Sequence, residues 1–181
     1  FQGDFANDFN GFVSLGMADV FSSVATGGNF TLYDNLQVEV PSGSIGTNYC
    51  SAANNSTGGF AGISATGSTA ASNNSLVLTC ENMPNSQFSY FICGQASGFI
   101  AGPGGSQGNL CILGQLGRFR SQLQNSGQTG SVSIDVDLTQ IPLNPVVAVQ
   151  PGDTWFFQLW YRDNNPGPTS NFSDGLQVDF Q

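Results

Sequence analysis

The sequence predicts an all-β fold: an antiparallel β-sandwich of the jelly-roll or immunoglobulin-like kind, stapled by disulfide bonds. Apolar and polar residues alternate with a period of two in several short stretches, and clusters of Gly, Pro and Asn separate these stretches. The one helix-compatible spacing, over residues 116–123, is short and contains Gly117. Many short strands divided by turns, without a long helical pattern, are typical of a sandwich.

Three stretches alternate most regularly. In residues 30–40 the apolar side chains share one face, with a break only at Asp34. Residues 132–138 alternate without a break, and residues 176–180 follow the same period. Each of these patterns predicts a strand that buries one face and leaves the other in water.

Residues 155–161 have a different pattern. They are apolar on both faces apart from Gln158, which predicts a central strand covered on both sides. Weaker patterns predict five further strands, at residues 12–17, 60–65, 76–80, 88–93 and 146–149.

The chain is predicted to divide near residue 42. Turn residues over 41–46 separate the predicted strand at 30–40 from the rest of the chain. We therefore expect an N-terminal strand segment over residues 1–42, either a donor strand or the end of a preceding β-domain, and a β-sandwich module over residues 43–181. Pairing of the strand with its own module is the alternative to donation.

The charge inventory excludes several classes of partner. Lysine is absent, and only three arginines stand against 12 acidic residues, for a net charge of -9. Nucleic acid is not an expected partner, because phosphate binding needs a basic stripe, and an anionic membrane surface is disfavoured for the same reason. A weakly charged surface of Ser, Thr, Asn, Gln and Gly repels copies of itself little, which permits close subunit packing.

The cysteine pattern predicts an oxidising compartment. The four cysteines include no C-x-x-C pair, and the chain has no histidine to complete a zinc site, so the even count favours two disulfides. No stretch approaches the ~18 apolar residues of a membrane span. The sequence begins at Phe1 without a basic segment, so we expect that an export signal has been removed and that the location is extracellular or at the cell surface.

Three groups of residues carry a resemblance to a known module. They are Tyr49-Cys50-Ser51-Ala52 with Asn55-Ser56-Thr57-Gly58, then Ser106 to Cys111 with Gly117-Arg118-Phe119, and Phe157 to Asp163 with Asn171 to Gly175. On these residues the chain, from about Asn48 onward, resembles a domain at the C-terminus of large secreted proteins of planctomycetes and other environmental bacteria. The resemblance implies an extracellular β-module and no assigned activity. Residues 1–40 loosely resemble the end of a concanavalin-like or jelly-roll sandwich.

The predicted disulfides are Cys50 with Cys111 and Cys80 with Cys93. The strands predicted at 76–80 and 88–93 follow each other across a Pro-Asn turn, which makes the inner pair local. Cys50 and Cys111 lie in the first two groups of residues that carry the resemblance. The resemblance also supports this pairing.

Catalysis is not expected. The usual bases for a Ser or Cys nucleophile are missing, because the chain has neither histidine nor lysine. Asp135 and Asp137 share a strand face, as the two carboxylates of a glycosidase might, but acidic residues on the wet face of a strand are usually only solvated. We assign no catalytic and no cofactor-binding residue.

Calcium is the one metal that the sequence suggests. Asp163, Asn164, Asn165 and Asp174 lie in and after a Pro-Gly turn, so their oxygen atoms could converge as calcium ligands, with Asp153 as a possible contributor. The alternative is that these residues only form the turn, since the regular spacing of a known calcium loop is absent.

Aromatic and basic residues suggest two further features. Trp160 and Tyr161 are candidate glycan contacts, with Trp155 and Tyr90 as further candidates, although aromatic residues in so apolar a strand are more often core. Separately, cations are scarce enough that we expect Arg118 and Arg162 to be partly buried and paired with carboxylates. Their expected partners are Asp163 and Asp174.

The sequence favours a non-enzymatic extracellular structural protein, a self-assembling subunit of a surface filament, stalk or matrix. Its expected partner is then itself, as a homopolymer in which residues 1 to about 40 contact, or complete the sheet of, an adjoining subunit. The alternative is a carbohydrate-binding or adhesion domain of a larger secreted protein, with glycans as partners.

Overall fold

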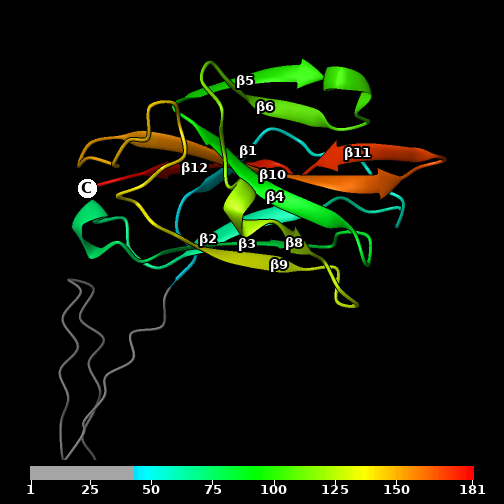
Figure 1. The fold of residues 1–181 in the computed structure, drawn as a ribbon, viewed down its shortest axis with the longest axis horizontal. Helices are drawn as coiled ribbons and strands as arrows, with labels where there is room; N and C mark the ends of the chain where they lie inside the picture. The colour runs from blue at the N-terminus through cyan, green and yellow to red at the C-terminus, as the bar shows by residue number, and fades with distance from the viewer. Residues whose placement is uncertain (1–42) are drawn as a thin grey trace, which may run out of the picture. The chain divides into compact units, whose positions relative to one another are not determined.

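The computed structural model describes residues 43–181, which fold into an antiparallel β-sandwich (Figure 1). Every strand pair is antiparallel. In the described part of the chain, no helix is long and apolar enough to cross a membrane. The short 3-10 helices are η1 (Ala71–Asn73), η2 (Pro103–Gly105) and η3 (Arg120–Gln122).

The strands form two sheets and a hairpin. The larger sheet has seven strands in the order β1 (Thr47–Tyr49), β12 (Gly175–Asp179), β10 (Thr154–Asn164), β4 (Phe88–Gly94) and β7 (Gly117–Arg118), with β11 (Pro168–Phe172) paired to β10 and β8 (Gln124–Asn125) paired to β4. The smaller sheet consists of β2 (Gly62–Thr66), β3 (Leu76–Glu81) and β9 (Val132–Val136), and the hairpin of β5 (Ala96–Ala101) and β6 (Asn109–Leu113).

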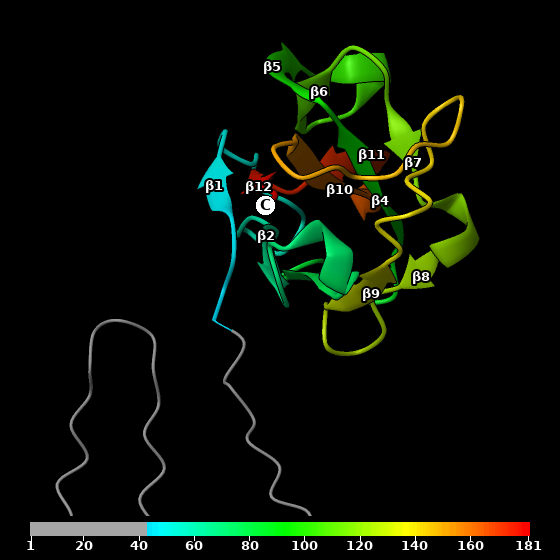
Figure 2. The ribbon, with the colours of Figure 1, turned by 90° about the vertical axis from the view of Figure 1, so that its left-hand side faces the viewer.

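The seven-stranded sheet is the middle layer. Figure 2 shows the β5–β6 hairpin on one side of it and the three-stranded sheet on the other. The larger apolar core fills the space between the two sheets, and a second core around Ile92, Ile112, Phe156 and Phe172 lies under the hairpin. The outer face of the large sheet is thus only partly covered, by a two-stranded element.

Strand β10 is covered on both faces, as predicted for residues 155–161. Trp155, Phe157, Leu159 and Tyr161 face the larger core. The alternate residues face outward: Phe156 is buried in the second core, and Gln158 is fully buried as well. Apolar packing on both sides explains why this strand lacks an alternating pattern.

Most of the predicted strands that fall within the described residues are present. The patterns at 60–65, 76–80, 88–93, 132–138 and 176–180 correspond to β2, β3, β4, β9 and β12. The strand predicted at 146–149 is wrong, since Val147 forms only an isolated bridge with Ile141. The strands predicted at 12–17 and 30–40, and the proposed boundary at residue 42, lie outside the described residues.

One predicted disulfide is confirmed and the other is wrong. Cys50 and Cys111 are bonded, whereas Cys80 and Cys93 are free, buried thiols. The prediction placed Cys80 and Cys93 on neighbouring strands, but β3 pairs with β2 and β9, and β4 pairs with β10. The chain between them therefore crosses from one sheet to the other instead of closing a hairpin.

Chemical labelling checks this cysteine assignment. Burial raises the pKa of Cys80 far above its usual range and that of Cys93 to about 12, so both thiols stay protonated and unreactive in the folded protein. Iodoacetamide should label no cysteine in the native protein and two, Cys80 and Cys93, in denaturant without reductant. Labelling of four cysteines or of none in denaturant would contradict the assignment.

Candidate functional site

The outer face of the seven-stranded sheet carries a row of three aromatic side chains. Trp160 on β10 is paired in register with Tyr90 on β4 and with Phe172 on β11. The ring centroids of Tyr90 and Trp160 lie 4.9 Å apart, with 32° between the ring planes. Phe172 is buried, but Tyr90 and Trp160 are half-buried. The pair thus presents ring surface to solvent from two central strands.

A hollow of about 210 Å³ adjoins this ring pair, and we call it the aromatic groove. Its walls combine the outer face of the sheet with residues of the β5–β6 hairpin and of the segment after it. The lining residues are Tyr90, Ile92, Pro103, Leu110, Leu116, Arg118, Trp160 and Phe172. Groove and ring pair form a largely apolar surface with one cation in its wall.

Two arginines lie at the aromatic groove. The guanidinium carbon of Arg162 is 5.6 Å from the centroid of the Trp160 ring, a cation–π geometry. Arg118 is paired in register with Ile92, lines the groove and is exposed, as is Arg162. The predicted burial of both arginines is wrong, because both lie on the solvent side of the large sheet.

The expected partners of these arginines are engaged elsewhere. Asp163 accepts hydrogen bonds from the backbone N–H of Ser56 (3.2 Å) and from the Asn171 side chain (3.4 Å). Asp174 accepts from the backbone N–H of Ile63 (2.8 Å). Both carboxylates therefore hold loops and strand edges, and neither neutralises a guanidinium.

The hairpin wall of the groove is fixed by buried polar contacts. The Gln158 side chain accepts a hydrogen bond from the backbone N–H of Cys111 (2.9 Å) and donates to the carbonyls of Asn109 (2.8 Å) and Ser173 (2.7 Å). The Tyr49 hydroxyl donates to the Cys111 carbonyl (2.8 Å), and Cys111 also carries the disulfide. These contacts hold β6, which supplies one wall of the groove, against the sheet.

The two predicted glycan contacts have different environments. Trp160 is half-buried and lines the groove, so its accessibility fits the prediction. Tyr161 points the other way: it is fully buried in the larger core, where its hydroxyl accepts a hydrogen bond from the Asn55 side chain (3.4 Å). Adjacent strand residues face opposite sides of a sheet, so only one of the two can contact a ligand at this face.

Three of the four predicted calcium ligands have separate hydrogen-bond partners. Asp163 is buried beside Ser56, and its carboxylate also accepts the backbone N–H of Asn164 (2.8 Å). The Asn165 carbonyl accepts a side-chain hydrogen bond from the η2–β6 segment, and Asp174 lies at the edge of β2. Among the described residues, no group of three Asp, Glu, Cys or His side chains is placed to hold a metal. That search does not cover the amide oxygens of Asn164 and Asn165, so the calcium site stays a prediction.

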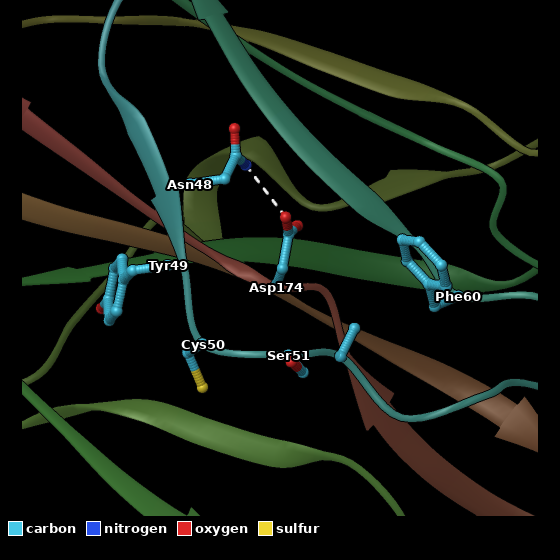
Figure 3. A pocket seen from close by; sticks show the side chains of 7 residues that line it. Asn48, Tyr49, Cys50, Ser51, Phe60 and Asp174 are labelled. Carbon is cyan, nitrogen blue, oxygen red and sulfur yellow. Dashed lines mark hydrogen bonds between the residues drawn. The ribbon is translucent and has the colours of Figure 1, made fainter.

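A second hollow, of about 360 Å³, lies where β1 passes the small sheet (Figure 3). It is lined by Asn48, Tyr49, Cys50, Ser51, Ala52, Phe60 and Asp174. The Asn48 side chain donates to Asp174 (2.9 Å) and to the carbonyl of Ile63 (2.7 Å), whose N–H donates to Asp174. The polar groups of this hollow thus act as a clamp on the edge of β2.

The clamp predicts an unusual dependence of stability on pH. Burial raises the pKa of Asp174, so as the pH falls the folded protein takes up this proton before the unfolded chain does. Acidification through the range between the folded-state and the unfolded-state pKa of Asp174 therefore favours the folded state. Relative to Asp174→Asn, the wild-type protein should gain stability between neutral pH and about pH 4, measured by urea unfolding.

Asp137 supplies a matched control with the opposite sign. Hydrogen bonds from the hydroxyl and the backbone N–H of Thr139 lower the pKa of Asp137. Its stabilising contribution is present at neutral pH and is lost as the pH falls, so the wild-type protein should lose stability relative to Asp137→Asn. Parallel pH dependences for the two variants would contradict the assignment of the clamp.

The same contacts bear on the carboxylate pair that was considered for catalysis. Asp135 and Asp137 both line a hollow of about 250 Å³ beside η3. Asp137 is held by Thr139 and by the Asn74 side chain (3.2 Å) as a turn-stabilising carboxylate. A lowered pKa is the reverse of what a general acid needs.

Sequence reasoning missed three parts of the site: Gln158, Phe172 and the exposed position of Arg118. The single polar residue within an apolar strand was a usable signal for Gln158, because a buried amide must find partners. Comparisons with known proteins add no relative: no family model, no curated protein and no solved structure matches the chain.

Proposed function

We propose that this chain is a non-catalytic extracellular domain that binds carbohydrate in the aromatic groove. The observation that carries the proposal is the half-buried Tyr90–Trp160 ring pair beside a hollow on the outer face of the sheet. Sugar rings present C–H groups on their faces, and aromatic side chains supply the apolar body that such faces pack against. A mainly apolar hollow with a few polar groups is the usual form of a small-ligand site.

The rigidity of the platform supports this function. Tyr90 and Trp160 extend from β4 and β10, whose opposite face forms the larger core. A ligand that stacks on them would not have to order the backbone, so little of its binding energy would be spent on conformational entropy. The Cys50–Cys111 disulfide agrees with an extracellular location, where such bonds persist.

Self-assembly by strand donation receives less support from the described residues. The exposed edge of β9 is already occupied: the Gln124 side chain accepts from Ser133 N–H (3.3 Å) and donates to its carbonyl (2.6 Å), and Gln122 donates to the carbonyl of Asp135 (2.8 Å). At the other edge of this sheet the Asn48–Asp174 clamp occupies Ile63. Side chains that hydrogen-bond to the backbone groups of an edge strand disfavour the addition of another strand there. Donation by residues 1–42 stays a prediction.

The test is binding of a panel of oligosaccharides by isothermal titration calorimetry. Trp160→Ala should weaken binding of the best ligand at least roughly tenfold, as loss of a stacked aromatic usually does. Phe60→Ala is the control, because Phe60 is exposed to 56% at the other hollow. An unaffected Trp160→Ala, or a loss confined to Phe60→Ala, would place binding outside the aromatic groove.

A further inference from the structure

We infer that the aromatic groove selects acidic saccharides, through recognition of uronic-acid carboxylates by Arg118 and by Arg162. This inference rests on the proposed carbohydrate-binding function and specifies its ligand class. The chain has three cations in 181 residues, and two of them lie at this one groove. In a protein with a net charge of -9, two cations at one groove favour an anionic ligand there.

The two guanidinium groups are available to a ligand. Arg118 and Arg162 are exposed, and within residues 43–181 their expected partners Asp163 and Asp174 are bonded to other groups. The guanidinium carbon of Arg162 lies over the Trp160 ring, 5.6 Å from its centroid. A guanidinium held near a ring face by cation–π attraction can still donate hydrogen bonds through its N–H groups.

The chemistry of these groups favours a carboxylate. A guanidinium donates two parallel hydrogen bonds to a planar carboxylate, and such charge-assisted bonds are about twice as strong as neutral ones. A sugar that packs into the groove meets Arg118 in the groove wall and Arg162, whose guanidinium lies over the Trp160 ring. One uronic-acid unit thereby supplies both an apolar ring face and an anion.

A densely sulfated saccharide fits less well. Its charge needs several cations along its length, and the remaining cation of the chain, Arg120, does not line the groove. The surrounding excess of acidic residues would repel the additional sulfates at low ionic strength. A ligand with one carboxylate on each sugar unit can instead place separate carboxylates at Arg118 and at Arg162.

The experiment compares tetragalacturonate with the same tetramer after reduction of its carboxyl groups to alcohols, by calorimetry on the full chain. Tetragalacturonate should bind at least roughly tenfold more tightly than the reduced tetramer. Arg118→Gln and Arg162→Gln should each remove most of this preference. Arg120→Gln is the matched control and should leave it intact, and unchanged melting temperatures would show that all three variants fold.

The outcomes separate the ligand class from the binding function. Equal binding of both tetramers that is weakened by Trp160→Ala but not by the arginine variants would overturn the acidic selectivity and keep the proposed function. Tighter binding of a sulfated tetramer would overturn the assignment to uronic acids. Failure of every acidic and neutral oligosaccharide to bind would overturn the proposed function itself.

Discussion

Replacing Gln158 by Leu should lower the free energy of unfolding by about 3–5 kcal/mol, because three buried backbone groups lose their partners and each costs roughly 1–3 kcal/mol. The three groups are the N–H of Cys111 and the carbonyls of Asn109 and Ser173. Leucine has a side-chain volume at least as large as that of glutamine but no hydrogen-bonding atoms. The loss should therefore come from unpaired polar groups and not from an empty cavity.

The effect of Gln158→Leu should be concentrated in the hairpin. Two of its three partners, Asn109 and Cys111, belong to β6, so hydrogen exchange should accelerate over β5 and β6 more than over β3. Gln140→Leu is the control, since Gln140 is exposed, and its effect should stay within about 0.5 kcal/mol. A Gln158→Leu protein as stable as the wild type would contradict the network.

Removing the disulfide should have a comparable effect. The double variant Cys50→Ser with Cys111→Ser lacks the cross-link between two residues that are 61 positions apart in the sequence. Its unfolded chain therefore has more conformational entropy than that of the wild type. Chain-entropy estimates for a loop of this length give about 4 kcal/mol of lost stability. The melting temperature should fall by roughly 10 °C, and the wild-type protein under strong reductant should show the same fall.

The free cysteines provide the comparison for this measurement. Reductant should have no effect on the double variant, because Cys80 and Cys93 form no bond that it could break. A further fall in melting temperature on reduction of the double variant would show that a second disulfide contributes. A loss of stability below about 1 kcal/mol for the double variant would contradict the role of the Cys50–Cys111 bond.

The strands that could be predicted are those in which each face meets a single environment along its whole length. β9 alternates because one face meets the core and the other meets water, and β10 is apolar on both faces because it lies between two cores. The hairpin strands β5 and β6 gave no such signal. β5 is largely exposed along its length, so its sequence is under little constraint from a core.

Which strands pair with one another could not be predicted from the sequence. Cys80 and Cys93 lie on consecutive strands, and consecutive strands usually pair, but the turn at Pro84 connects two different sheets here. The same limit applies to the candidate site. Tyr90, Trp160 and Arg118 come together through the pairing of β4 with both β10 and β7, which local spacing does not encode.

The two tryptophans give the most direct test of carbohydrate binding at the groove. Trp155 is fully buried, with its indole N–H donating to Asp153 (3.2 Å), whereas Trp160 lines the groove and is half-buried. In nitrogen-15 NMR spectra, titration with the panel of acidic and neutral oligosaccharides should shift the indole signal of Trp160 saturably and leave that of Trp155 in place. No shift of the Trp160 signal with any member of the panel would contradict the proposed function.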